Sequence, residues 1–179
     1  MEVQKLHIQY VKINIVLILL ILRVSLVFGQ DEIPAEYPLH RSLNLNIGYN
    51  YSFGEPNDKN FHLLDIGFNK TVFGGRHGAG FEYGISNEIG LNTDKFTIGP
   101  KVRGIAYYQF IVLGLELVSY TDFDNGNLRL VPMLGFGSNK FRVTINPQVS
   151  VVNDDFQPID NGLINFTFNL SLKNYEVGN

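Results

Sequence analysis

The sequence contains no cysteine. This absence excludes disulfides, thiol catalysis, zinc–thiolate sites and a lipid anchor on an N-terminal cysteine. Basic residues are also few, with 14 Lys and Arg against 17 Asp and Glu, which is not the charge balance of a nucleic-acid binder. Long apolar runs are missing too. The longest uninterrupted run lies at residues 15–22, well short of the roughly 20 residues that a transmembrane helix needs.

That short run lies in a segment with the layout of an export signal. Lys5 and Lys12 provide a positive region, residues 13–22 are apolar apart from Asn14, and Gly29 is a small residue before a plausible cleavage point. We therefore predict a signal peptide over residues 1–29, in preference to a retained membrane helix. Taking Lys5, Lys12, Arg23 and Glu2 away would leave 11 basic and 16 acidic residues on a mature chain of 150 residues, enough for one domain.

The mature part of the chain alternates between apolar and polar residues. In the last such stretch, residues 163–174, the apolar members are Ile164, Phe166, Phe168, Leu170 and Leu172. Residues 43–53 near the start follow the same pattern. Since successive side chains of a strand point to opposite faces, each stretch predicts a strand with one apolar and one polar face.

Eight such strands can be placed, separated by segments rich in Gly, Asn, Asp and Pro. They are expected at residues 41–53, 60–73, 80–91, 95–108, 110–120, 127–137, 140–152 and 163–175. After a short periplasmic leader at 30–40, residues 41–179 would form the barrel domain. The predicted fold is all-β, an eight-stranded antiparallel up-and-down transmembrane β-barrel, because closure leaves no unpaired backbone in lipid.

One long apolar segment and three prolines do not fit a simple pattern of alternating strands. The apolar residues 105–118 could be mistaken for a helix, but Gly104, Gly114 and Glu116 favour a hairpin that turns near Gln109. Prolines at 100, 132 and 147 lie inside proposed strands and cannot donate a ladder hydrogen bond, so bulges or shifted strand ends are expected there.

Alternation alone does not say which face points outward. If the apolar face is outward, the opposite face carries four acidic and five basic residues, which could pair inside a narrow barrel as a polar plug with no open pore. This predicted lumen charge network consists of Asp65, Glu82, Glu88, Lys101, Arg103, Glu116, Arg129, Arg142 and Lys173. The alternative is a soluble periplasmic, lipocalin-like barrel with these charges in water and a small apolar ligand inside. Aromatic residues toward the strand ends, such as Phe53, Tyr83 and Tyr108, favour the membrane interpretation.

Several short motifs resemble those of small outer-membrane β-barrel proteins of Bacteroidetes-type bacteria. They are Gly99-Pro100-Lys101, the segments 120–123 (Tyr-Thr-Asp-Phe) and 131–137 (Val-Pro-Met-Leu-Gly-Phe-Gly), and the junction Gly29-Gln30. Met133 stands where such proteins often carry an acid. The resemblance implies an integral protein of the outer membrane of a Gram-negative bacterium, a family mostly without assigned activity.

Signals of catalysis are sparse. His40 and Ser42 have the His-x-Ser spacing that looks like the site of lipid A deacylases, so a lipid-modifying enzyme is a further alternative, although an enzyme is not the expectation. We predict no catalytic, cofactor or metal site. The predicted external loops are acidic, with residues 55, 58, 94, 122, 124, 154, 155 and 160 against Lys59, and could meet cations that bridge lipopolysaccharide. The expected partners are outer-membrane lipid, lipopolysaccharide and the barrel assembly machinery, with no nucleic acid.

Overall fold

The computed structural model describes residues 39–57, 59–75 and 77–176. The predicted signal peptide and all but the last two residues of the predicted leader lie outside these ranges. The strands are β1 (His40–Phe53), β2 (His62–Gly74), β3 (Ala79–Gly90), β4 (Ile98–Tyr108), β5 (Ile111–Thr121), β6 (Gly126–Gly137), β7 (Phe141–Pro147), β8 (Val149–Val152) and β9 (Gly162–Glu176).

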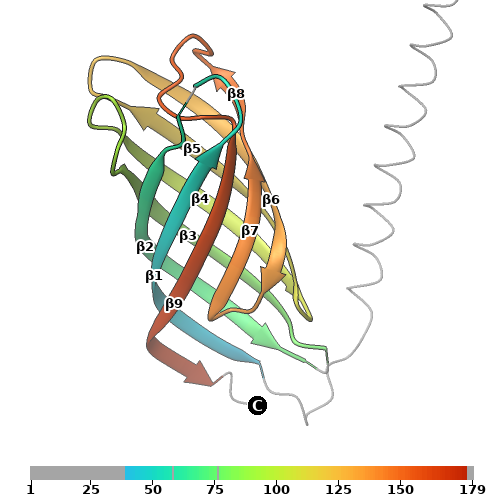
Figure 1. Ribbon diagram of the computed structural model, residues 1–179. Coiled ribbons are helices and arrows are strands. Elements are labelled where there is room, and N and C mark those ends of the chain that lie inside the picture. The colour runs from blue at the N-terminus through green and yellow to red at the C-terminus, as the bar shows by residue number, and fades with distance from the viewer. Residues whose placement is uncertain (1–38, 58, 76, 177–179) are drawn as a thin grey trace, which may run out of the picture. The chain divides into compact units, whose positions relative to one another are not determined.

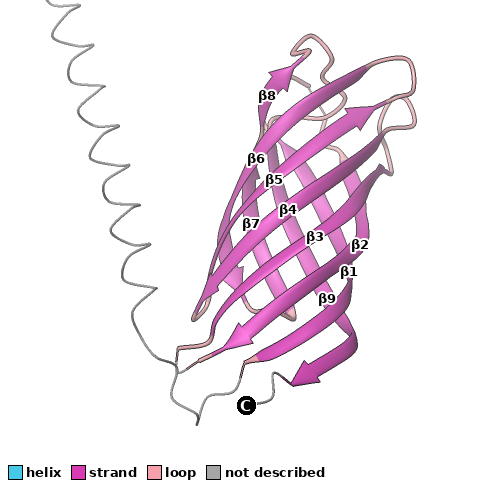
Figure 2. Ribbon diagram, turned by 180° about the vertical axis from the view of Figure 1, so that it is seen from behind, coloured by secondary structure: helices cyan, strands magenta, loops and turns pink. Residues whose placement is uncertain are grey.

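These strands form a closed antiparallel barrel (Figures 1 and 2). Each strand from β1 to β7 pairs with the next one along the chain, including β5 with β6. The ring closes through β9, which pairs with both β7 and β1. The short β8 continues the line of β7 and pairs with β6, so the ring has eight strand positions. The predicted eight-stranded antiparallel barrel is confirmed. The part of the chain that the structure describes contains no helix long and apolar enough to cross a membrane.

The two ends of the barrel differ. Three long connections, residues 54–61, 91–97 and 153–161, and the shorter connection 122–125 lie at what we call the loop end, at the top of Figure 1. Short connections at 75–78, 109–110 and 138–140 lie at the opposite turn end. The predicted hairpin within residues 105–118 is confirmed, because β4 ends at Tyr108, β5 begins at Ile111, and Gln109 between them has φ 53°.

The prolines interrupt the ladders. The predicted seventh strand is divided at Gln148, directly after Pro147. Opposite this point, β6 pairs with β8 up to Leu130 and with β7 only from Leu134, so the ladder is open around Pro132. On β4, Pro100 pairs with Asn87 of β3, but the ladder to β5 passes from Ile98 to Lys101. A proline nitrogen has no hydrogen to donate, which accounts for these gaps.

The polarity of the side chains follows the alternation of the strands, with apolar side chains on the outside of the barrel and polar ones on the inside. Outward-facing side chains are mostly large and apolar, such as Ile85, Leu115 and Phe168, which are 62%, 50% and 56% exposed. Inward-facing side chains are mostly polar or charged and are buried. Two apolar clusters lie inside at either end of the polar interior. The cluster at the loop end contains Phe61, Leu63, Val118, Tyr120, Val131, Ile159 and Leu163; the cluster at the turn end contains Ile105, Tyr107, Val112 and Met133.

Candidate functional site

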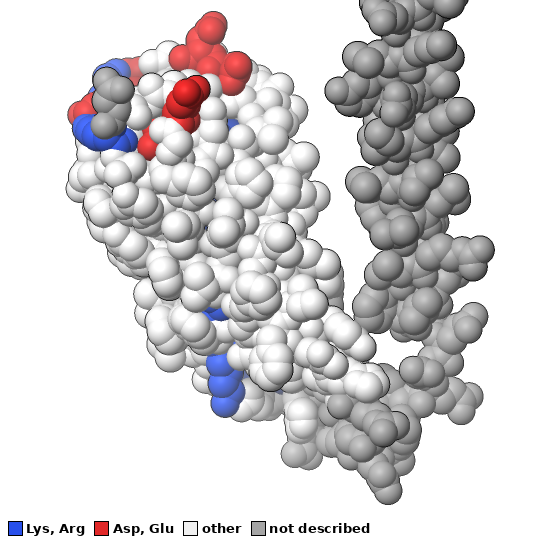
Figure 3. All heavy atoms as spheres, turned by 45° about the vertical axis from the view of Figure 1, so that its right-hand side comes forward, with Lys and Arg blue, Asp and Glu red and all other residues white. Residues whose placement is uncertain are grey.

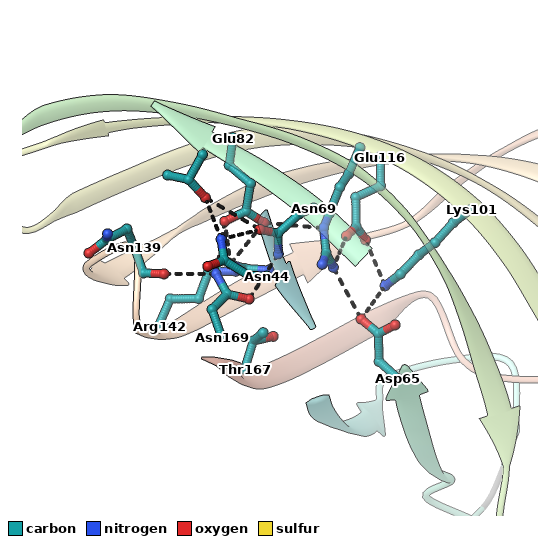
Figure 4. Close-up of polar contacts among 12 residues, drawn as sticks. Asn44, Asp65, Asn69, Glu82, Lys101, Glu116, Asn139, Arg142, Thr167 and Asn169 are labelled. Carbon is teal, nitrogen blue, oxygen red and sulfur yellow. Dashed lines mark hydrogen bonds and ion pairs between the residues drawn. The ribbon is translucent and has the colours of Figure 1, made fainter. Parts of the chain in front are cut away.

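The most unusual feature of the interior is an ion-pair network halfway along the barrel (Figure 4). Lys101 of β4 lies at its centre. The Lys101 Nζ atom is 2.6 Å from a carboxylate oxygen of Glu88, 3.1 Å from one of Asp65 and 3.3 Å from one of Glu116. All four side chains are at most 2% exposed. One ammonium group therefore contacts carboxylates from three strands, β2, β3 and β5.

The ladder register explains why a cation is needed there. Asp65 on β2 and Glu88 on β3 are direct cross-strand partners, and both side chains point inward. Like charges opposite each other destabilise a sheet, and the repulsion is stronger for buried side chains such as these than for charges in bulk water. Lys101 contacts both carboxylates, which turns a repulsive pair into part of an attractive network.

Arg103 extends the network toward the turn end. Its guanidinium group lies 3.2 Å from Asp65, 3.4 Å from Glu82 and 3.8 Å from Glu116. Glu116 is also its cross-strand partner on β5. Opposite charges at one ladder position are the favourable arrangement for a cross-strand pair.

Glu82 of β3 is the next link. Arg142 Nη1 of β7 donates to both oxygens of Glu82 at 3.2 Å, and the Tyr107 hydroxyl donates to it at 2.8 Å. The amide of Asn169 on β9 also donates to this carboxylate, at 3.0 Å. From there, hydrogen-bonded amides continue across the barrel from Asn169 to Asn69 and Asn44. Hydrogen bonds from these donors offset the cost of removing the Glu82 carboxylate from water.

Arg129 of β6 lies toward the loop end and binds the loop 153–161. Its guanidinium group donates to the carbonyl oxygens of Ile159 and Asp160 at 3.2 and 3.1 Å, and to the Gln157 side chain at 2.6 Å. Gln148 accepts a further bond at 2.6 Å. Arg129 and Ile159 are both fully buried, so this loop folds into the mouth of the barrel.

Asp160 secures the same loop from the other side. Its carboxylate accepts hydrogen bonds from the Ser52 hydroxyl at 2.9 Å and from the backbone N–H of Asn57 at 3.0 Å. Glu88 connects this region to the central network, since it accepts hydrogen bonds from Asn50 and from the Tyr120 hydroxyl. The polar interior is thus continuous from one apolar cluster to the other.

Eight of the nine residues of the predicted network lie inside the barrel and are 0–5% exposed. The prediction for Lys173 is wrong. Lys173 pairs with Leu43 and Ser171 pairs with Asn44, so Leu172 is an extra residue in β9 and the alternation reverses beyond it. Lys173 consequently stands on the outward face, where its ammonium lies 4.8 Å from the centre of the Tyr175 ring.

The prediction of an acidic rim needs a second correction. Asp160, expected in an exposed loop, is buried, and Asp58 lies outside the described residues. Lys59 pairs with Asp94, and Lys95 lies 3.2 and 3.1 Å from Asp122 and Asp124. Hydrogen bonds from the backbone of Asn125 and from Lys95 hold the pKa of the Asp122 carboxyl below its ordinary value, and the two aspartates raise the pKa of Lys95. Among the described residues, no group of three or more His, Asp and Glu side chains is arranged to hold a metal ion.

His40 and Ser42 lie at the start of β1, at the turn end. Within the described ranges, no hydrogen bond joins these two side chains. Met133 packs in the apolar cluster at the turn end. Sequence reasoning overlooked Tyr107, Tyr120 and the inward asparagines as members of the interior network, although their position on the polar face of the strands was a usable signal.

Three comparisons with known proteins gave no further information: no family model, no curated protein and no solved structure matches this chain.

Proposed function

We propose that this chain is an integral outer-membrane β-barrel protein with a structural or interaction role, and that its polar interior is a plug without an open pore. The proposal includes the family resemblance described above and the expected contacts with outer-membrane lipid, lipopolysaccharide and the barrel assembly machinery. One observation carries it: ionised side chains fill the inside of the barrel, while large apolar side chains cover the outside.

The outward surface supports a hydrocarbon environment. Monomeric proteins in water rarely present contiguous apolar patches larger than a few hundred Å². Here the exposed apolar residues extend around all the strands. On the face seen in Figure 3, the strand region is almost free of charged atoms apart from a small basic spot toward the lower end, and charged atoms gather over the loops. A charge-free band between polar ends is the pattern of a transmembrane barrel.

The strands have suitable lengths for this role. A transmembrane strand tilted by about 45° needs about 9–11 residues. Seven of the eight ring positions are single strands of 11 to 15 residues, and the eighth is shared by β7 and β8.

The interior argues against the lipocalin-like alternative. A barrel that binds an apolar ligand needs an apolar cavity among its inward side chains. The middle of this interior instead contains Lys101, Arg103, Asp65, Glu82 and Glu116, which contact one another directly. The same contacts argue against a conducting channel, because an eight-stranded barrel is just wide enough for its side chains to fill.

Fractionation and electrophoresis test the proposal. The protein should be recovered with outer membranes, and the unboiled sample should migrate differently from the boiled one. Purified protein added to planar lipid bilayers should give no conductance steps. Recovery as a soluble periplasmic protein would refute the membrane assignment, and regular conductance steps would refute the plug.

A further inference from the structure

The outward face carries three cations near the turn end of the barrel. Arg41 and Lys70 line one groove of about 530 Å³, together with Ser42, Leu43, Tyr83 and Tyr175 among others. Lys173 is beside it, since Leu43 has Lys70 as its ladder partner on one side and Lys173 on the other. The rest of the outward surface of β1, β2, β3 and β9 is almost entirely apolar.

None of the described side chains, which do not include that of Glu176, gives these cations a carboxylate partner. The ion pairs there join either inward side chains or lysines of the loop end, and none involves Arg41, Lys70 or Lys173. Every described side chain on the outward face of these four strands is neutral or basic. A group of cations without local acids attracts an anion, and long basic side chains can bring their charges to a membrane interface while their stems lie on apolar surface.

A second groove continues from the first one toward the middle of the barrel. It has a volume of about 420 Å³ and shares Leu43, Lys70 and Tyr83 with the basic groove. Its other outward side chains are apolar: Phe68, Ile85 and Val102. Gly84 also lines it and contributes only backbone. A basic groove that leads into an apolar groove matches a molecule with an anionic head and a hydrocarbon tail.

We propose that these two grooves bind an anionic phospholipid of the leaflet at the turn end, with the headgroup phosphate at Arg41, Lys70 and Lys173 and an acyl chain along Phe68, Ile85 and Val102. Tyr83 and Tyr175 border the headgroup, the position that aromatic side chains favour at a membrane interface. This inference rests on the proposed membrane location and adds a lipid preference to it.

The test uses a single tryptophan, because the natural chain has none. The variant Phe68→Trp places this reporter in the apolar groove. The protein is reconstituted into vesicles in which either phosphatidylglycerol or phosphatidylcholine carries brominated acyl chains, which quench tryptophan on contact. The ratio of the two quenching curves gives the preference of the groove for the anionic lipid.

We expect a clear preference for phosphatidylglycerol. Adding Lys70→Gln should reduce it by about fivefold, the factor that corresponds to about 1 kcal/mol per basic residue near an anionic lipid surface. Adding Arg41→Gln as well should abolish most of the preference that remains. In the protein with Phe68→Trp alone, 1 M NaCl should weaken the preference for phosphatidylglycerol. Lys140→Gln, which removes an exposed charge from the connection between β6 and β7, is the matched control and should leave the preference unchanged.

Equal quenching by the two lipids, or an equal loss with Lys140→Gln, would overturn the lipid site while leaving the membrane proposal intact. Absence of quenching by either lipid would refute the membrane location and the lipid site together. Migration of unboiled samples on gels verifies that each variant is folded. If the double variant does not fold, Lys70→Gln and the salt series decide the outcome.

Discussion

Replacing Lys101 by methionine should strongly destabilise the barrel. The substitution keeps an unbranched side chain of similar length but removes the ammonium group that contacts Asp65, Glu88 and Glu116 together. Arg103 would still lie 3.2 Å from Asp65 and 3.8 Å from Glu116. Glu88 would keep its hydrogen bonds from Asn50 and Tyr120 but lose its cation. The variant therefore breaks three buried ion pairs, and it leaves one carboxylate, that of Glu88, without a cation in contact.

Removing one partner of a buried pair costs about 3–5 kcal/mol in the free energy of unfolding. With a dependence on urea of about 2 kcal/mol per molar, the midpoint of unfolding should fall by about 2 M. The assay is urea titration in detergent micelles or vesicles, with the folded fraction read from the unboiled band on a gel. Lys140→Met, at an exposed position, should change the free energy by less than about 0.5 kcal/mol.

A second substitution distinguishes electrostatics from packing. Glu88→Gln neutralises the carboxylate that Lys101→Met leaves without a cation, so the double variant should be more stable than Lys101→Met alone by about 1 kcal/mol or more. A loss below about 1 kcal/mol for the single variant, or strictly additive effects in the double variant, would refute the reasoning.

Three further predictions follow from other parts of the structure. Arg129→Met should release the loop 153–161 from the barrel mouth, because three hydrogen bonds from Arg129 to this loop disappear. Limited proteolysis should then cut the loop in the variant before it cuts the parent protein, and identical digestion would contradict the assignment. Leu115→Arg, at the outward middle of β5, should cost about 2–4 kcal/mol of stability in bilayers, measured by urea unfolding, and a neutral effect would count against lipid contact. The pKa of the Asp122 carboxyl, measured by NMR titration, should lie below 3.8, so the stability that this carboxylate gives to the loop is complete above pH 3.8 and is lost as the pH falls through the lower folded-state pKa. Lys95→Met should raise the pKa of Asp122. An unchanged pKa in this variant would exclude Lys95 as a cause.

The strands and most of the charged residues of the interior could be predicted from the sequence, because both follow from an alternation with a period of two residues. That period also explains the error at Lys173. One extra residue, Leu172, reverses the two faces of β9, and a bulge of this kind leaves no mark in an alternating sequence.

The loop 153–161 was misjudged for another reason. Asp160 belongs to a segment whose composition is typical of an exposed turn, yet it lies inside the barrel. Its burial depends on hydrogen bonds with Ser52 and Asn57, which are more than 100 residues away in the sequence. It also depends on the hydrogen bonds that Arg129 donates to the carbonyl oxygens of residues 159 and 160. Long-range partners of this kind are not visible in local patterns.

The orientation of the two faces is the claim on which the account depends, and spin labels test it most directly. Because the chain has no cysteine, single cysteines can be introduced at Leu113, Leu115 and Leu117 and at the inward Glu116, then labelled with a nitroxide in vesicles. The three outward labels should collide frequently with oxygen dissolved in lipid and rarely with a water-soluble nickel complex, while the label at Glu116 should be shielded from both. Frequent collisions of the outward labels with the nickel complex would contradict the membrane-facing surface.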